Sequence, residues 1–135
     1  MTVDEMRKLY GIGLKADGKR KRGHAESDIQ QACVRWFRWE YPRYLCFAVP
    51  NGGSRNAVEG ANMKKEGVLA GVSDLIVIAD HKVLFVEMKT RKGRQQDTQK
   101  EFQHRVEVLG FRYVVCRSLD DFINAVRAWL GRTSV

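Results

Sequence analysis

Short apolar runs alternate with polar segments along this chain, and their spacing predicts a mixed α/β fold. Four runs are rich in β-prone apolar residues, as buried strands are: 44–49, 72–79, 82–89 and 111–116. Helical patterns lie between and around them, at 24–42, 57–66, 97–109 and 118–130. The order αβαββαβα indicates a mixed β-sheet flanked by helices.

Residues that commonly start or stop helices mark the ends of these segments. Pro42 ends the first long helix, Gly67 and Gly110 close two later ones, and Ser118 suits the N-cap of the last. Residues 2–10 have the composition of an additional short helix.

The middle pair of strands ends in charged residues. In "VLFVEMKT", residues 83–90, Glu87 and Lys89 follow an unbroken apolar run and share one face of the strand, because side chains alternate. If Asp80-His81 is a two-residue hairpin turn, residue i faces residue 161 minus i, so Glu87 lies opposite Asp74. Opposed residues have Cβ atoms roughly 4.5–5.5 Å apart. The pattern therefore predicts a close pair of carboxylates.

Two carboxylates this close need a positive partner. Lys89 alone would make the strand end a solvated salt bridge. A divalent cation is the alternative, since Mg²⁺ prefers carboxylate oxygens and water, and the Met88 carbonyl is available as a further ligand. A metal there would polarise a phosphoryl oxygen, and Lys89 would orient the attacking water. The second reading predicts a phosphodiesterase site.

The first long helix offers two acids near its start. At about 100° per residue, Glu26 falls on the apolar side of the helix with Gln30, whereas Asp28 falls on the side expected to face water. Glu26 is therefore the candidate for the site. The alternative is that Glu26 only favours the positive end of the helix dipole.

Net charge is the feature of the composition that bears on function. The chain carries 24 Lys and Arg against 16 Asp and Glu, a net charge of +8, which suits a polyanionic partner such as nucleic acid. Half of the surplus lies in residues 1–23, interpreted as a flexible basic N-terminal arm ahead of a domain spanning 24–135. A solvated tail is an equal alternative for this arm.

Other features restrict the class of protein. The chain has 135 residues, enough for one domain with its own core. No apolar stretch approaches the roughly 18 residues of a membrane span, and no signal peptide is visible. The three cysteines are far apart in apolar contexts, which favours reduced core thiols in a cytoplasmic protein.

Five linked motifs resemble the VRR-Nuc family of PD-(D/E)xK nucleases. They are Glu26 to Gln30, "PNGGSR" at 50–55, "GVLAGVSDL" at 67–75, "EMK" at 87–89 and "QKEF" at 99–102. The resemblance covers about residues 24–130. One departure is Ser73, where the family usually has proline; proline there supplies no ligand, so activity is expected to survive.

The resemblance implies a restriction-endonuclease-like fold and Mg²⁺- or Mn²⁺-dependent hydrolysis of DNA. It places Glu26, Asp74, Glu87, Lys89 and Gln99 in the catalytic site, with Glu26, Asp74, Glu87 and the Met88 carbonyl as metal ligands. It also implies a likeness to Holliday-junction resolvases, which act on branched or four-way-junction DNA and can be homodimers.

Basic and amide side chains near these motifs are candidates for binding the DNA backbone: Asn51, Arg55, Lys64, Lys65, Arg91, Lys92 and Arg94. Each of the cations could instead be solvated surface. Two alternatives to an endonuclease remain: a noncatalytic nucleic-acid-binding module, and an enzyme acting on small phosphate compounds. Clustered carboxylates argue against the first, and the lack of a phosphate-binding glycine motif argues against the second.

Overall fold

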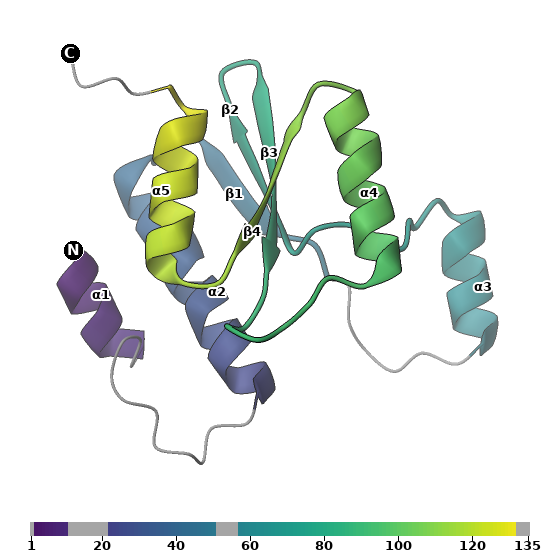
Figure 1. The fold of residues 1–135 in the computed structure, drawn as a ribbon, viewed down its shortest axis with the longest axis horizontal. Coiled ribbons are helices and arrows are strands. Elements are labelled where there is room, and N and C mark those ends of the chain that lie inside the picture. Colours follow the sequence, from purple (N-terminus) through teal and green to yellow (C-terminus); the bar gives the residue numbers. More distant parts are fainter. Residues whose placement is uncertain (1, 11–21, 51–56, 132–135) are drawn as a thin grey trace.

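A computed structural model describes residues 2–10, 22–50 and 57–131. It contains five helices and four strands in these ranges (Figure 1). The helices are α1 (Val3–Tyr10), α2 (Arg22–Glu40), α3 (Ala57–Lys65), α4 (Asp97–Val108) and α5 (Leu119–Trp129). The strands are β1 (Leu45–Ala48), β2 (Leu75–Ala79), β3 (Lys82–Met88) and β4 (Arg112–Cys116). The predicted α/β class and element order are confirmed.

The four strands form one mixed sheet in the order β1-β2-β3-β4. β1, β2 and β3 are antiparallel, whereas β4 runs parallel to β3 because α4 provides the crossover. Leu75 pairs with Val86, and Ala79 with Lys82, as the predicted two-residue turn requires. His81 adopts a left-handed φ of 55° in that turn.

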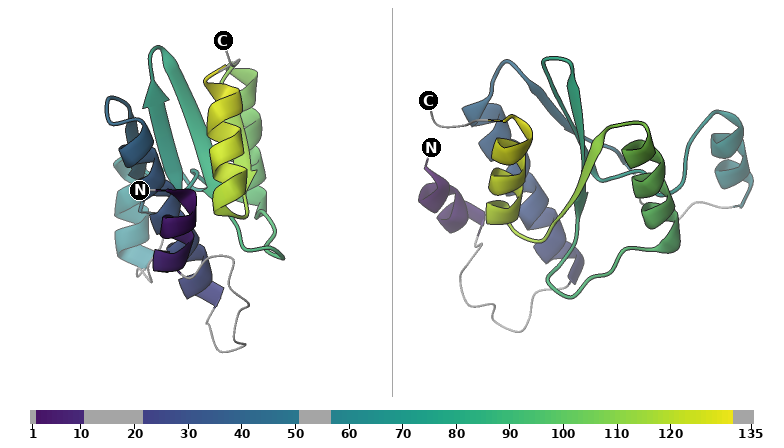
Figure 2. Two further views of the ribbon diagram at one scale, coloured as in Figure 1. Left: turned by 90° about the vertical axis from the view of Figure 1, so that its left-hand side faces the viewer. Right: turned by 45° about the horizontal axis from the view of Figure 1, so that its top comes forward.

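Helices cover both faces of the sheet, so its central strands are apolar on both sides (Figures 1 and 2). The larger core lies between the sheet and helices α2 and α5; it includes Phe37, Leu84, Val86, Met88 and Phe122. A smaller core on the opposite face packs α4 against β3 and β4 and consists of Phe102, Val106 and Tyr113, with Phe85 against them. The alternation along β3 therefore sends Leu84 and Val86 to one core and Phe85 to the other.

The N-terminal residues differ from the expected flexible arm. Residues 3–10 form α1, which packs against α2, and Met6 is fully buried in the larger core. Arg7 also forms an ion pair with Asp120 at the start of α5. The predicted short helix at 2–10 is therefore confirmed, but it packs on the domain instead of belonging to a flexible arm, because the apolar side chain of Met6 anchors it. Residues 11–21 lie outside the described part.

The other boundaries lie within three residues of those predicted, and several coincide with them. The expected strand at 72–79 begins only at Leu75, since Ser73 and Asp74 precede the paired residues. Gly67 and Gly110 have the positive φ values typical of residues that end helices, and the Ser118 side chain accepts a hydrogen bond from the Asp121 N–H as an N-cap.

Candidate active site

Asp74 and Glu87 come together at the end of the β2–β3 hairpin. The observed register places them opposite each other, one step beyond the Leu75–Val86 pair. The Met88 N–H donates a hydrogen bond to Asp74 Oδ2 at 2.8 Å, which fixes the aspartate against β3. Glu87 is only 1% exposed. The predicted carboxylate pair is therefore present, and one of its members is buried.

Glu87 accepts two long hydrogen bonds from the elements on the α4 side of the sheet. Gln99 Nε2 donates to Glu87 Oε1 at 3.3 Å, and the Tyr113 hydroxyl donates to Oε2 at 3.4 Å. Lys89 Nζ lies 4.0 Å from Oε1, the outer limit of an ion pair. A nearly buried carboxylate with these weak contacts is incompletely compensated as an anion.

The electrostatics of the pair reflect this lack of compensation. Burial, reinforced by the neighbouring Asp74, raises the pKa of Glu87 to about 9, against the opposing effects of Lys89 and Tyr113. Burial and the charge of Glu87 likewise raise the pKa of the Tyr113 hydroxyl, so it stays protonated and able to donate. Without an added cation, the site favours a proton on Glu87.

Gln99 is held in place by the first turn of α4. Its side-chain oxygen accepts a hydrogen bond from the Gln96 N–H at 2.8 Å, which leaves its amide nitrogen directed at Glu87. Gly71, with a φ of 84°, lies against the same turn: a Cβ on Gly71 would come within 2.1 Å of the Thr98 carbonyl oxygen. The absence of a side chain at residue 71 thus lets the segment before Asp74 approach α4.

Glu26 reaches the site from α2, on the opposite face of the sheet. It lines a cavity of about 380 Å³ beyond the ends of the strands. Burial and the charge of Asp74 raise the pKa of Glu26, while Lys89 and the Thr90 backbone lower it. Asp28 does not line this cavity. Asp28 is nevertheless half-buried like Glu26, so it does not face water as the helix phase predicted, and the assignment of Glu26 rather than Asp28 to the site stays a prediction.

The loop after β3 forms the rim of the same cavity. Lys89, Thr90, Gly93 and Arg94 contribute to its lining. Arg117, which follows β4, donates from one guanidinium nitrogen to the carbonyls of Thr90 at 2.8 Å and of Gly93 at 2.6 Å. This side chain therefore fixes the backbone of the loop that follows the lysine.

The remaining predicted DNA contacts are spread more widely. Arg94 lines the cavity, whereas Arg91 and Lys92 are exposed on the adjacent loop. Lys64 and Lys65 are exposed at the end of α3, which is set apart from the sheet beyond α4 (Figure 1). Asn51 and Arg55 lie outside the described residues.

Three residues of the site were not predicted from the sequence. Tyr113 supplies a donor to Glu87, Gln95 Nε2 donates to the Tyr113 hydroxyl at 3.2 Å, and Arg117 fixes the loop. The tyrosine belongs to an ordinary apolar strand pattern, and its place beside the site depends on the parallel pairing of β4 with β3. A polar hydroxyl on a buried strand was the available signal for Tyr113.

The donor set suits a hard divalent cation, though with fewer direct ligands than predicted. Over residues 2–10, 22–50 and 57–131, no three His, Cys, Asp or Glu side chains converge closely enough to hold a metal ion. Asp74 and Glu87 provide carboxylate oxygens, and the Met88 carbonyl points to the same side as its N–H, toward Asp74. Mg²⁺ commonly uses one or two carboxylates and several waters, which this pair can satisfy.

The class of protein that these features define is an α/β protein with a four-stranded mixed sheet, helices on both faces, and an acidic pair, a lysine and a glutamine together at one end of the sheet. The VRR-NUC domain model matches residues 24–120, and the chain belongs to this family of nuclease-like domains.

Among solved structures, a "VRR_NUC domain protein" has the same fold, with a TM-score of 0.64 and 22% sequence identity. The alignment covers 79% of this chain and 88% of that one. No protein with a curated description matches the chain. No helix within the described ranges is long and apolar enough to cross a bilayer.

Proposed function

We propose that this protein is a Mg²⁺- or Mn²⁺-dependent endonuclease that hydrolyses DNA phosphodiester bonds, with branched or junction DNA as the preferred substrate. The observation that carries the proposal is the buried Glu87 beside Asp74. Two carboxylates held close together repel each other, which a protein that only binds a polyanion has no reason to maintain. The same pair can bind a divalent cation. The net charge of +8 supports a nucleic-acid substrate.

Each side chain has a distinct role in this proposal. Asp74, Glu87 and the Met88 carbonyl would hold the metal, and Glu26 would contact its water shell from the α2 side. When bound, the metal would acidify a water and polarise a phosphoryl oxygen. Lys89, which lines the cavity and is 13% exposed, would orient the attacking water and offset charge that develops on the phosphate.

Gln99 and Tyr113 would act on Glu87 rather than on the substrate. Both donate to its carboxylate, one to each oxygen. Such donors orient a ligating carboxylate and limit the directions of its lone pairs. Arg94, on the cavity rim, would contact the DNA backbone next to the reacting phosphate.

Cleavage assays test this function directly. Purified protein would be incubated with plasmid, single-stranded, flap and four-way-junction DNA, in Mg²⁺, Mn²⁺ or EDTA. We expect metal-dependent cleavage, and Lys89→Ala should bind DNA nearly as well yet cleave at least about 100-fold more slowly. Cleavage that continues in excess EDTA would contradict the proposal. Light scattering of the protein on junction DNA would show whether it acts as a homodimer.

Glu26 and Asp28 provide a matched pair of variants on one helix. Glu26→Gln should lose most cleavage with little change in the free energy of unfolding, and Asp28→Asn should cleave normally. Loss of activity in the Asp28 variant alone would show that the wrong acid has been assigned to the site.

A noncatalytic DNA-binding module is the alternative function. A protein of that kind would bind the tested DNA substrates and cleave none of them.

The three cysteines are free and buried. Reduced thiols are typical of cytoplasmic proteins, and we propose that this protein is cytoplasmic.

A further inference from the structure

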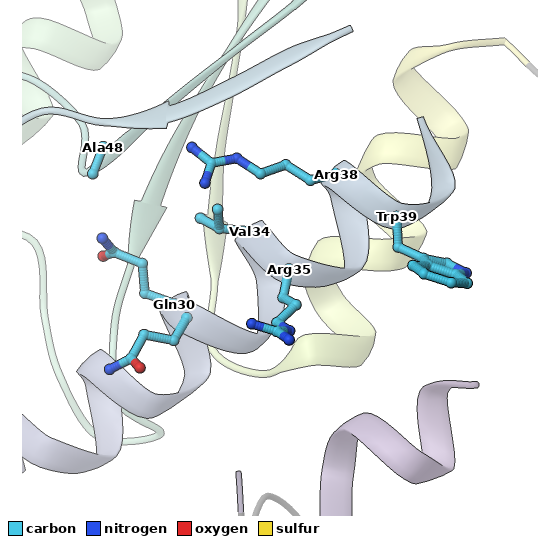
Figure 3. A pocket seen from close by; sticks show the side chains of 7 residues that line it. Gln30, Val34, Arg35, Arg38, Trp39 and Ala48 are labelled. Atoms are coloured by element: carbon cyan, nitrogen blue, oxygen red, sulfur yellow. The ribbon is translucent and has the colours of Figure 1, made fainter. Parts of the chain in front are cut away.

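A second and larger hollow lies on the outer surface of α2, beside the edge strand β1. Its volume is about 650 Å³ (Figure 3). Its lining comprises seven residues from α2 and β1: Gln30, Gln31, Val34, Arg35, Arg38, Trp39 and Ala48. We call it the α2 groove. Among the described residues that line it, two are arginines and none is acidic, so the charge of this lining complements an anion.

The lining residues from α2 form two rows spaced by four residues. Gln30, Val34 and Arg38 make the row on the β1 side, and Gln31, Arg35 and Trp39 make the neighbouring row. Figure 3 shows the side chains of Arg35 and Trp39 directed away from β1. Arg38 is tied to the sheet, since a guanidinium nitrogen donates to the Cys46 carbonyl at 3.1 Å. Arg35 is exposed. One row thus forms a wall, and the other presents a cation and an aromatic ring to the solvent.

Trp39 is an unusual residue for a solvent-facing position. Its side chain is 64% exposed, whereas Trp36 and Trp129 are 2% and 6% exposed in the larger core. A large exposed aromatic surface beside cations is typical of surfaces that stack nucleic-acid bases. Base stacking needs a free base face, which an unpaired strand offers and an intact duplex does not.

The α2 groove adjoins the cavity that Glu26 and Lys89 line. Gln30 contributes to both linings, and Gln31 Nε2 donates to the hydroxyl of Ser27, which also lines that cavity, at 3.1 Å. Ser27 and Trp39 are twelve residues apart, or about 18 Å along the helix at 1.5 Å per residue. At the rise of about 3.4 Å per nucleotide that a stacked strand has in B-DNA, roughly five nucleotides span this distance, and an unstacked strand needs fewer.

We propose that the α2 groove binds an unpaired DNA strand that extends from the cleavage site, with a base stacked on Trp39 and a phosphate paired with Arg35. The proposal rests on the endonuclease function and adds a substrate class to it: DNA with a single-stranded arm, such as a flap or a splayed end. A groove of this volume accommodates a ligand of small-molecule width rather than a duplex. The cationic lining favours a nucleic-acid strand over an apolar peptide.

Binding measurements in EDTA test the site without any dependence on cleavage. Thymine oligonucleotides should quench the tryptophan fluorescence of the protein, because Trp39 is the exposed tryptophan of the three. Trp39→Ala should abolish the quenching and lower affinity for the oligonucleotide by about 5- to 150-fold, the range that alanine substitution gives for one stacked base. Affinity for a blunt duplex should change little.

Matched controls lie on α4 and just beyond its end. Leu109, exposed at 74%, is the control for loss of an apolar surface, and Arg105 is the control for loss of one positive charge. Arg35→Ala should reduce the salt dependence of oligonucleotide binding by about one unit of slope, and Arg105→Ala should not.

Two results would overturn the proposal. One is equal oligonucleotide affinity in Trp39→Ala and Leu109→Ala. The other is conversion of a dimer to a monomer by Trp39→Ala, with oligonucleotide affinity unchanged, since this would assign the face to a second copy of the chain. Normal oligonucleotide binding without cleavage in any metal would instead refute the endonuclease function and leave the groove intact.

Discussion

Glu87→Gln should make the metal-free protein more stable at neutral and alkaline pH. Glu87 is 1% exposed, faces Asp74 and has Lys89 only at 4.0 Å, so ionising it inside the fold is unfavourable. Glutamine has the same shape, can accept the bond from Gln99 and can donate from its amide toward Asp74. The substitution therefore removes the charge and keeps the packing.

The magnitude follows from the raised pKa of Glu87. The folded protein retains a proton that the unfolded chain releases above about pH 4.5, so the free energy of unfolding falls as pH rises from about 5 to 9. At pH 7 the solution is about 2.5 units above the ordinary pKa, which gives an upper bound of about 3 kcal/mol at 1.36 kcal/mol per unit. Relaxation and water entry reduce this to an expected gain of about 1–2 kcal/mol.

Urea denaturation in EDTA at pH 5, 7 and 8 measures this gain. The difference between Glu87→Gln and the wild type should be near zero at pH 5 and grow with pH. Glu101→Gln, an exposed acid on α4, is the control for a general change in charge and should show no such trend. Mn²⁺ should stabilise the wild type by binding the folded state, and should have much less effect on Glu87→Gln.

Two outcomes would refute this reasoning. If Glu87→Gln is no more stable than the wild type at pH 8, the carboxylate is not buried with an unfavourable charge. If its advantage is the same at pH 5 and pH 8, the gain comes from packing or hydrogen bonding and not from ionisation.

Three further predictions concern the residues that hold the site in place and the binding of DNA. Gly71→Ala should lower the free energy of unfolding by about 1–3 kcal/mol and should also slow cleavage, because the new methyl group would push the first turn of α4, with Gln99, away from Glu87. Urea denaturation measures the first effect, and cleavage assays measure the second. Arg117→Gln should speed trypsin cleavage after Arg91 and Lys92, as mass spectrometry of the fragments would show, because the loop loses the bonds that fix it. Unchanged fragment rates would mean that the loop is held by other contacts. DNA affinity, measured by anisotropy, should fall steeply between low and moderate salt; a flat response would argue against phosphate contacts.

The hairpin that carries the site could be predicted from the sequence because its determinants are local. Two apolar runs separated by Asp80-His81 suggest a two-residue turn, and the register of such a turn, which the structure has, sets Asp74 opposite Glu87. The helical phase of α2 likewise separates Glu26 from Asp28 within a few residues of sequence. The family match over 24–120 agrees with the resemblance seen in the linked motifs, and the roles of the individual residues stay predictions.

Contacts between distant segments required the tertiary structure. Tyr113 reaches Glu87 because β4 pairs in parallel with β3, and a parallel register is set by the crossover through α4 rather than by any turn. The burial of Met6 depends on the packing of α1 against α2, which no local sequence pattern contains.

The α2 groove is a feature of the same kind. Its lining depends on how α2 packs beside β1. The sequence shows that Trp39 lies on a helix, but it does not show which side of that helix stays exposed after packing. Local spacing determined the chemistry at the end of the hairpin. Packing between elements decided which side chains surround that chemistry and which surfaces stay exposed, because those outcomes depend on long-range contacts that no short window of sequence contains.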